Sequence, residues 1–296
     1  MKVAILGCGY VGLELCRQLS ETDVGIVGVR RSANGLTAVE STGANSIRAD
    51  VTDPDTLARI PDVNALVFAA SSGGRDASAA RAVYVDGLKA VIDEFGSRTK
   101  PPEQLVYTSS TGVYGDHSGD WVDETTKPRP TTEKTEVLAE AERVALEQSE
   151  RHGIDGTVVR LGGIYGPDRY RLDRYLERPV TEGYRNIIHR DDAAGILRFV
   201  LESADEDVIL GVDNEPIGKW AFADWLAAEC GVEPPPKQSV EERLEEGNLS
   251  ERVRRRLRTT KRCSNDLLRE LGYEYRYPTY REGYRPAIEA YRNDQS

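Results

Sequence analysis

The sequence predicts an α/β protein: a Rossmann-type, doubly wound parallel sheet with a small, mainly helical C-terminal lobe. Short, continuously apolar segments alternate with helical segments over the first two-thirds of the chain. This alternation is typical of a parallel sheet that helices cover on both faces. A glycine-rich turn follows the first apolar segment, at the place where such folds bind phosphate groups.

Seven segments have the length and apolar content of buried strands. They are residues 2–6, 24–29, 46–49, 65–70, 104–109, 157–161 and 208–212. Helices are expected between them, at residues 11–20, 76–96, 132–152 and 191–203. Right-handed crossovers through these helices make the strands parallel.

The alternation of apolar strands and helices ends near Asn214, and the composition changes there. The segment WAFADWLAAECG predicts an amphipathic helix that Gly231 closes, and a highly charged stretch and a tyrosine-rich end follow it. We therefore expect residues 1–166, completed by about 187–212, to form the nucleotide-binding domain. Residues 167–186 and 213–296 are expected to form a smaller substrate lobe.

Charge and hydropathy exclude several classes of protein. The net charge of −11 argues against a nucleic-acid binder, which is usually basic. No apolar run approaches the roughly 18–20 residues that cross a bilayer, and the first residues predict a strand instead of a signal peptide. The four cysteines and three histidines do not cluster, so no metal site is expected. These features predict a cytoplasmic protein.

The kind of charge is also informative. Of 39 basic residues only eight are lysine, against 50 acidic residues. A carboxylate-rich surface stays hydrated in concentrated salt, where screening reduces self-repulsion. The composition indicates a halophilic source, or else a GC-rich genome, which also favours arginine over lysine.

The first turn has the spacing of a phosphate-binding loop. Gly7, Gly9 and Gly12 follow a strand and open a helix, with Tyr10 and Val11 between the last two. Glycines at this spacing allow a tight turn, close approach to a pyrophosphate and close helix–strand packing, while the helix N-terminus presents N–H groups to the anion.

The end of the second strand indicates which dinucleotide binds. An acidic residue there would bind the ribose 2′-hydroxyl of NAD, whereas arginine accommodates the 2′-phosphate of NADP. The chain has Arg30, Arg31 and Ser32 at this point, and the nearest upstream carboxylate, Asp23, precedes the strand. NADP(H) is therefore favoured over NAD(H), although two solvated arginines on a loop would give the same pattern.

Together with later segments, this turn resembles the extended short-chain dehydrogenase/reductase family, which contains nucleotide-sugar epimerases and dehydratases. The resemblance covers nearly the whole chain. The segments that carry it are ADVTD (49–53), VFAAS (67–71), YVDGLKAV (84–91), TSSTGVYG (108–115), RLGGIYGP (160–167) and IHRDDAAG (188–195).

The resemblance implies several contacts with a dinucleotide. Asp50 and Val51 would lie at the adenine, and Ala69, Ala70 and Ser71 would run past the ribose. Gly163 and Ile164 would lie beside the nicotinamide. The resemblance also implies a homodimer through the helices at 76–96 and 132–152.

One family feature is missing from the sequence. The family uses a serine, matched here by Ser110, with a tyrosine and a lysine four residues apart that pass a proton to or from the substrate oxygen. The pair should open the helix at 132–152, but the chain has no tyrosine between Tyr114 and Tyr165. The chain resembles an atypical subgroup that also lacks the pair.

Three functions therefore stay open. In the first, an oxidoreductase or epimerase/dehydratase-like enzyme acts on a hydroxyl or carbonyl group of a small molecule such as a sugar or nucleotide-sugar. Tyr114 would then supply the phenol and Lys134 the charge, and Arg169 and His189 would bind the substrate. In the second, the fold holds NADP(H) as a sensor or regulator without catalysis. In the third, an interaction scaffold binds no dinucleotide.

Overall fold

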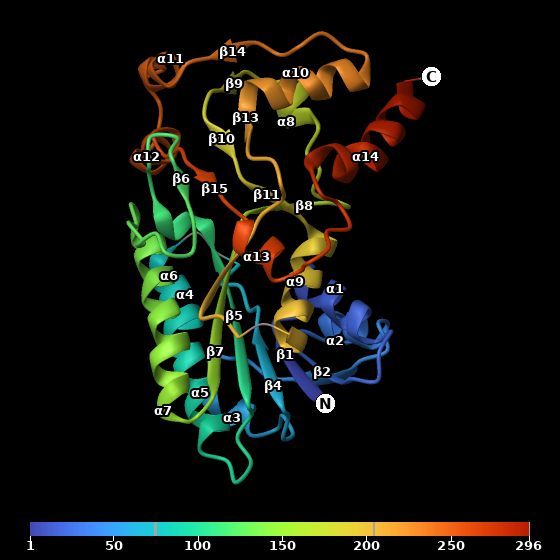
Figure 1. Cartoon of the computed structure of the whole chain (residues 1–296), viewed down its shortest axis with the longest axis vertical. Coiled ribbons are helices and arrows are strands. Elements are labelled where there is room, and N and C mark those ends of the chain that lie inside the picture. Colours follow the sequence, from blue (N-terminus) through green and yellow to red (C-terminus); the bar gives the residue numbers. More distant parts are fainter. Residues whose placement is uncertain (74–75, 204, 296) are drawn as a thin grey trace. The chain divides into compact units, whose positions relative to one another are not determined.

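A seven-stranded parallel sheet is the centre of the computed structural model, which describes residues 1–73, 76–203 and 205–295 (Figure 1). The strand order is β12–β7–β5–β4–β1–β2–β3. Strands β2 and β3 are added on one side of β1, and β4 and the later strands are added on its other side, so the switch point lies between β1 and β4. The strands are β1 (Lys2–Leu6), β2 (Gly25–Arg30), β3 (Asn45–Arg48), β4 (Ala65–Phe68), β5 (Gln104–Ser110), β7 (Asp155–Leu161) and β12 (Val208–Gly211). The predicted fold class and its seven strands are confirmed.

The central strand β1 is buried on both faces. It pairs in parallel with β2, where Val3 lies opposite Ile26, and with β4, where Val3 lies opposite Ala65. The side chains of Val3, Ala4, Ile5 and Leu6 are all 0% exposed. A continuously apolar strand is what this position requires, because helices cover both faces of the sheet.

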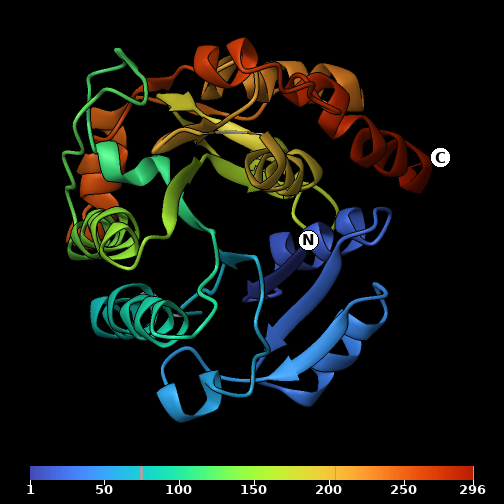
Figure 2. The same ribbon diagram turned by 60° about the horizontal axis from the view of Figure 1, so that its bottom comes forward.

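Two helical layers cover the sheet (Figure 1, Figure 2). One contains α1 (Tyr10–Leu19), α2 (Ala33–Glu40) and α9 (Arg190–Ser203). The other contains two long helical segments, each interrupted by a wider π-helical turn. They are α4 (Ala77–Arg81), η1 (Ala82–Gly87) and α5 (Leu88–Gly96), and α6 (Glu133–Arg143), η3 (Val144–Gln148) and α7 (Ser149–Arg151). The four expected helical segments are helical, whereas α2 and α3 (Pro54–Leu57) were not predicted.

The chain divides into two compact units. The first contains residues Met1–Val113, Glu133–Arg160 and Ala193–Ile209, and the second contains Tyr114–Thr132, Leu161–Asp192 and Leu210–Ser296. Residues 114–132, 161–166, 187–192 and 210–212 were expected with the first domain but lie in the second unit. In the segment 114–132, β6 (Trp121–Val122) pairs with β15 (Arg262–Cys263) of the second unit.

The second unit combines helices with short strand pairs. Its helices are α8 (Asp173–Leu176), α10 (Lys219–Cys230), α11 (Val240–Glu245), α12 (Glu251–Leu257), α13 (Asp266–Glu270) and α14 (Tyr280–Gln295). The remaining strand pairs are β8 (Gly163–Tyr165) with β11 (Ile187–His189), β9 (Val180–Thr181) with β14 (Lys237–Gln238), and β10 (Tyr184–Arg185) with β13 (Ile217–Gly218).

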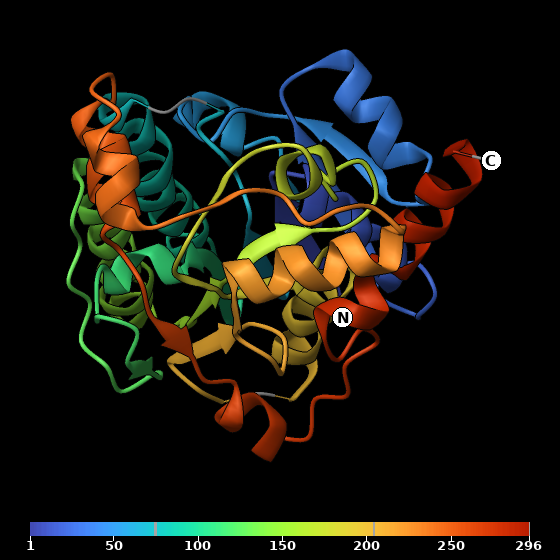
Figure 3. The same ribbon diagram turned by 90° about the horizontal axis from the view of Figure 1, so that it is seen from above.

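Helices α10 and α14 pack against each other in this unit (Figure 3). Their buried aromatic side chains Phe222, Tyr280 and Tyr284 belong to its apolar core. Helix α10 ends at Gly231, whose φ of 71° provides the left-handed cap that the sequence predicted. Within the described residues, no helix is both long enough and apolar enough to cross a bilayer.

Candidate functional site

The glycine turn connects β1 to α1 and packs against the loop after β4. Gly7 has a φ of 102°, a left-handed conformation that favours glycine. A Cβ atom on Gly7 would overlap the backbone of Ala70, and one on Gly12 would lie 2.7 Å from the carbonyl oxygen of Gly7. The turn itself therefore requires glycine at both positions.

Gly9 is different, because the surrounding protein leaves space beside it. A Cβ atom on Gly9 would have Nη1 of Arg30 as its nearest atom, at 3.7 Å. Gly9 is also the N-cap of α1, which opens with Tyr10 and Val11. The first N–H groups of a helix have no partner within the helix, so this opening can accept an anionic group.

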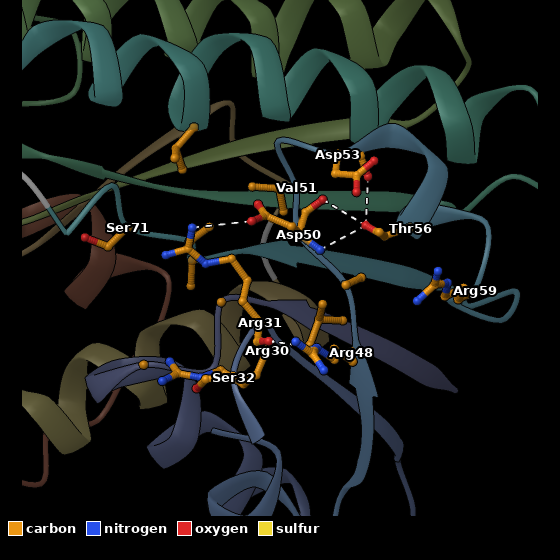
Figure 4. Close-up of a pocket in the computed structure, with 17 residues that line it drawn as sticks. Arg30, Arg31, Ser32, Arg48, Asp50, Val51, Asp53, Thr56, Arg59 and Ser71 are labelled. Carbon is orange, nitrogen blue, oxygen red and sulfur yellow. Dashed lines mark hydrogen bonds and ion pairs between the residues drawn. The ribbon is translucent and has the colours of Figure 1, made fainter. Parts of the chain in front are cut away.

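A cavity of about 900 Å³ lies beside the turn, at the carboxyl ends of the parallel strands (Figure 4). The last residues of β2 and β3 and the residues that follow β1, β2, β3 and β4 form its wall, together with Val83 of η1. This volume is typical of a site for a small molecule or cofactor. Of the proposed dinucleotide contacts, the structure places these on the wall: Gly7, Gly9, Arg30, Arg31, Ser32, Asp50, Val51, Ala69, Ala70 and Ser71.

The two arginines after β2 have different surroundings. Arg30 donates a hydrogen bond from Nη1 to the carbonyl oxygen of Cys8 at 2.8 Å. Cys8 lies within the glycine turn, so this bond stabilises the conformation of the turn. Arg31 extends across the cavity wall to Asp50, with 3.4 Å between Nη1 and Oδ2, and its side chain is 63% exposed. Ser32 caps α2, since its hydroxyl accepts a hydrogen bond from the Gly35 N–H.

Asp50 is held in one conformation at the end of β3. The backbone N–H and the hydroxyl of Thr52 both donate to its Oδ1, at 3.0 and 2.8 Å. Burial alone would raise the pKa of the Asp50 carboxyl. The hydrogen bonds from Thr52 and the charge of Arg31 outweigh it, so this pKa lies below its usual value. Asp50 is therefore ionised at neutral pH and accepts hydrogen bonds.

Sequence reasoning missed seven residues of the cavity wall, four of which are polar or charged: Arg48, Asp53, Thr56 and Arg59. Arg48 ends β3, and its Nε donates to the carbonyl oxygen of Arg31 at 3.1 Å (Figure 4). A signal was available in the sequence, because Arg48 lies only two residues before the predicted contact Asp50. The wall thus carries four arginines, which makes it suited to an anion.

Ser110 and Lys134 both lie in the first unit. Ser110 ends β5, and its hydroxyl accepts a hydrogen bond from the Gly112 N–H at 3.1 Å. A Cβ atom on Gly112 would lie 3.5 Å from the side chain of Thr135, so the start of α6 packs beside this strand end. Lys134, one residue before Thr135, directs its ammonium group to Tyr84 of η1, with Nζ 6.0 Å from the ring centroid.

Tyr114 lies in the second unit, and its side chain is 0% exposed. Its hydroxyl donates a hydrogen bond to the carbonyl oxygen of Asp123 at 2.6 Å. This bond uses the only proton of the phenol. The observed conformation of Tyr114 therefore suits a residue that holds the segment 114–132 together.

The remaining predicted contacts also belong to the second unit. Gly163 and Ile164 form β8, where Ile164 lies opposite Ile188 of β11. His189 is 1% exposed, and its Nδ1 accepts a hydrogen bond from the Asp191 N–H at 3.2 Å. Arg169 is exposed. The structure thus puts a buried imidazole and an exposed guanidinium in this unit.

Comparison with known proteins assigns the chain to a family. Residues 3–209 match the model of the NAD dependent epimerase/dehydratase family. The chain is 28% identical to protein YeeZ of Escherichia coli K12 over 293 residues, which cover 94% of this chain and 96% of that protein.

Two solved structures extend the comparison. One, from Methylobacillus flagellatus and provisionally named an NAD-dependent epimerase/dehydratase, is 30% identical with a TM-score of 0.76, covering 98% of each chain. UDP-glucose 4-epimerase from Thermotoga maritima, solved with UDP-glucose, is 18% identical with a TM-score of 0.81, covering 100% of each chain. At that identity the likeness concerns the fold.

Proposed function

Because the chain belongs to the NAD-dependent epimerase/dehydratase family, within the extended short-chain dehydrogenases/reductases, we propose that it binds NADP(H) and acts on a hydroxyl or carbonyl group. The observation that carries this proposal is the arginine-lined cavity beside the glycine turn. A bound nicotinamide would supply or accept the hydride, and the protein would position the substrate and move the proton.

The residues of the first unit fit a dinucleotide. The opening beside Gly9 and the first N–H groups of α1 would hold the pyrophosphate. The ionised Asp50 and the neighbouring Val51 would hold the adenine. The loop from Ala69 to Ser71, whose backbone packs against Gly7, would face the ribose.

The preference for NADP over NAD rests on charge. Arg31 and Arg48 lie at the ends of β2 and β3, where the 2′-phosphate would be placed, and Arg31 is largely exposed. The nearest carboxylate, Asp50, is already paired with Arg31. A 2′-phosphate would gain charge-assisted hydrogen bonds from both guanidinium groups.

The proposed substrate is a small carbonyl or hydroxyl compound, with sugars and nucleotide-sugars as the first candidates. UDP-glucose is bound in the Thermotoga maritima structure, which shares the fold. Ser110 would orient the substrate oxygen from the end of β5. Within the second unit, the exposed Arg169 and the buried His189 are the proposed substrate-binding residues.

A second function is supported by one specific observation. Helix α6 has no tyrosine from Glu133 to Arg143, so the usual Tyr–Lys pair is missing from its usual helix. A chain that keeps the cavity but not the pair could bind NADP(H) as a sensor. The two functions share the cofactor and differ in whether hydride is transferred.

Titration of the purified protein with NADPH and with NADH, in concentrated KCl and followed by cofactor fluorescence, tests the proposal. Wild type should bind NADPH more tightly. The variants Arg31→Ala and Arg48→Ala should each weaken NADPH by about 10-fold or more, with little effect on NADH, because one charge-assisted contact contributes about 1.5–3 kcal/mol.

Arg17→Ala is the matched control. Arg17 of α1 pairs with Glu14 and with Glu21, and it is not on the cavity wall. It should leave both affinities unchanged. Equal binding of NADPH and NADH by wild type would contradict the NADP preference, and binding of neither would contradict the dinucleotide site.

A further inference from the structure

Tyr84 is a buried phenol beside the loop that follows β4. It lies in the π-helical turn η1, next to the cavity-lining Val83, and its side chain is 8% exposed. The N–H of Ser72, in the loop after β4, donates to its hydroxyl oxygen at 3.4 Å. A wider π-helical turn is often found at a functional site.

Lys134 faces this phenol from another helix. It is the second residue of α6, which packs against η1 and against β5. Its ammonium nitrogen lies 6.0 Å from the centroid of the Tyr84 ring, within the range of a cation–π interaction. A phenol and an ammonium group that are fifty positions apart in the sequence are therefore neighbours in the first unit.

The electrostatic surroundings favour ionisation of this phenol. Burial alone would raise the pKa of Tyr84, but hydrogen bonds with Ser71 and Ser72 and the charge of Lys134 outweigh burial, so its pKa lies below the usual value of 10. Tyr107 of β5 interacts electrostatically with Tyr84. Burial, followed by the charge of Glu142, raises the pKa of Tyr107 well above the usual value, so Tyr107 stays neutral.

The pair is connected to both strand ends that would border a substrate. Ser71, which interacts with the Tyr84 hydroxyl, lines the cavity after β4. Thr135, next to Lys134, packs beside Gly112, which follows Ser110 at the end of β5. All these residues belong to the first unit.

We infer that Tyr84 and Lys134 form the phenol–ammonium pair that α6 alone lacks, and that Tyr84 is the proton donor and acceptor of the site. The inference rests on the proposed function above. It departs from the family arrangement, in which both groups come from one helix four residues apart.

The proton balance of the step is simple. If a bound reduced nicotinamide supplied hydride to a substrate carbonyl carbon, the substrate oxygen would need one proton. The O–H bond of Tyr84 breaks, its proton passes to that oxygen, and an alcohol forms. The phenolate that remains is stabilised by Lys134 and by the Ser72 N–H, and it takes a proton from water through Ser71. Oxidation of an alcohol runs in the opposite direction.

The first test measures the phenol directly and requires neither cofactor nor substrate. Tyrosinate absorbance near 295 nm is followed against pH for wild type, Tyr84→Phe and Lys134→Gln. The difference between wild type and Tyr84→Phe should show one tyrosine that ionises below pH 10. In Lys134→Gln that ionisation should move to higher pH.

The controls are Tyr291→Phe and Lys100→Gln, which remove a tyrosine of α14 and an exposed lysine outside the helices. Both should keep the early ionisation. If wild type and Tyr84→Phe coincide below pH 10, the inference is wrong. Lys134→Gln provides an independent reading if Tyr84→Phe does not fold.

The second test separates this inference from the proposed function. Tyr84→Phe should bind NADPH within about twofold of wild type, because the phenol acts on the proton and not on the phosphates. In a screen of UDP-hexoses and simple aldehydes for NADPH oxidation, Tyr84→Phe should lower kcat by about 10²–10⁴-fold.

The outcomes are distinct. Equal kcat in wild type and Tyr84→Phe would overturn the role of Tyr84 and leave the proposed function standing. Failure of wild type to bind NADPH would overturn the proposed function, while the tyrosinate titration would still decide whether Tyr84 and Lys134 form a pair.

Discussion

Gly7 and Gly9 stand in one turn, but the protein backbone needs them for different reasons. A side chain on Gly7 would meet both a left-handed φ and the backbone of Ala70, whereas a Cβ atom on Gly9 would make only ordinary van der Waals contacts, the nearest with Nη1 of Arg30 at 3.7 Å. The protein fold therefore does not itself require a glycine at position 9, whereas a pyrophosphate bound there would. Substitutions at the two positions can separate these two requirements.

Gly7→Ala should reduce the free energy of unfolding by roughly 2–4 kcal/mol, the sum of left-handed strain and steric overlap. Gly9→Ala should cost about 1 kcal/mol or less, but should weaken NADPH by about tenfold or more because the methyl group occupies the proposed pyrophosphate position. Urea unfolding and fluorescence titration measure the two effects. Unchanged NADPH affinity in Gly9→Ala would show that the pyrophosphate does not bind at this turn.

The predicted dinucleotide contacts that lie on the cavity wall could each be recognised from a short segment of the sequence. Gly7, Arg31 and Asp50 each follow the end of a strand by one or two residues, and parallel strands bring their carboxyl ends to one edge. The pair Tyr84–Lys134 could not be predicted in this way. The two residues are fifty positions apart in the sequence, and only the packing of η1 against α6 brings them together. A search for two residues four positions apart on one helix does not find them.

At the scale of the elements, α6 is attached to the sheet by a buried ion pair. Glu142 of α6 accepts a hydrogen bond from Nη2 of Arg160 on β7 at 2.9 Å, and one from the Ser109 hydroxyl on β5 at 2.5 Å. The carboxylate and guanidinium side chains are 5% and 6% exposed. Because α6 carries Lys134, this network also fixes the position of the ammonium group.

Glu142→Ala should destabilise the protein by about 3–5 kcal/mol, because it leaves the Arg160 charge buried without its carboxylate. The double variant Glu142→Met with Arg160→Met should lose less, since no unpaired charge remains. Urea unfolding of the single and double variants measures both. If Glu142→Ala is within about 1 kcal/mol of wild type, the ion pair does not hold α6 in place.

The regular elements could be predicted because their cause is local. An apolar run of the right length becomes a strand, and all seven predicted strands form the sheet. Helix α2 was missed because it depends on a single cap at Ser32 in a segment of weak periodicity. The two-residue strand pairs of the second unit were missed because each joins distant segments, as β6 does with β15, and two residues give no periodicity.

At the scale of the whole molecule, the dominant feature is the net charge of −11, with 50 acidic residues against 39 basic ones. Self-repulsion of this charge opposes the compact state at low ionic strength. Salt shortens the screening length from about 10 Å at 0.1 M to about 3 Å at 1 M. The stability of the folded state should therefore increase with salt concentration, and the size of the increase should depend on the net charge.

The melting temperature should rise between 0.1 and 2 M KCl, by on the order of 5 °C if screening recovers about 2 kcal/mol. A matched variant isolates the electrostatic part of this rise from other effects of the salt. It replaces three exposed carboxylates with amides: Glu103→Gln, Glu233→Gln and Glu289→Gln. Its net charge is −11 + 3 = −8.

Because self-repulsion scales with the square of the net charge, the variant should keep only about half of the electrostatic rise. It should also melt higher than wild type at 0.1 M KCl and converge with it at 2 M. Thermal unfolding by circular dichroism at matched KCl concentrations measures both. A wild-type melting temperature that is flat across this range would favour a GC-rich genome, and not adaptation to salt, as the origin of the arginine-rich, lysine-poor composition.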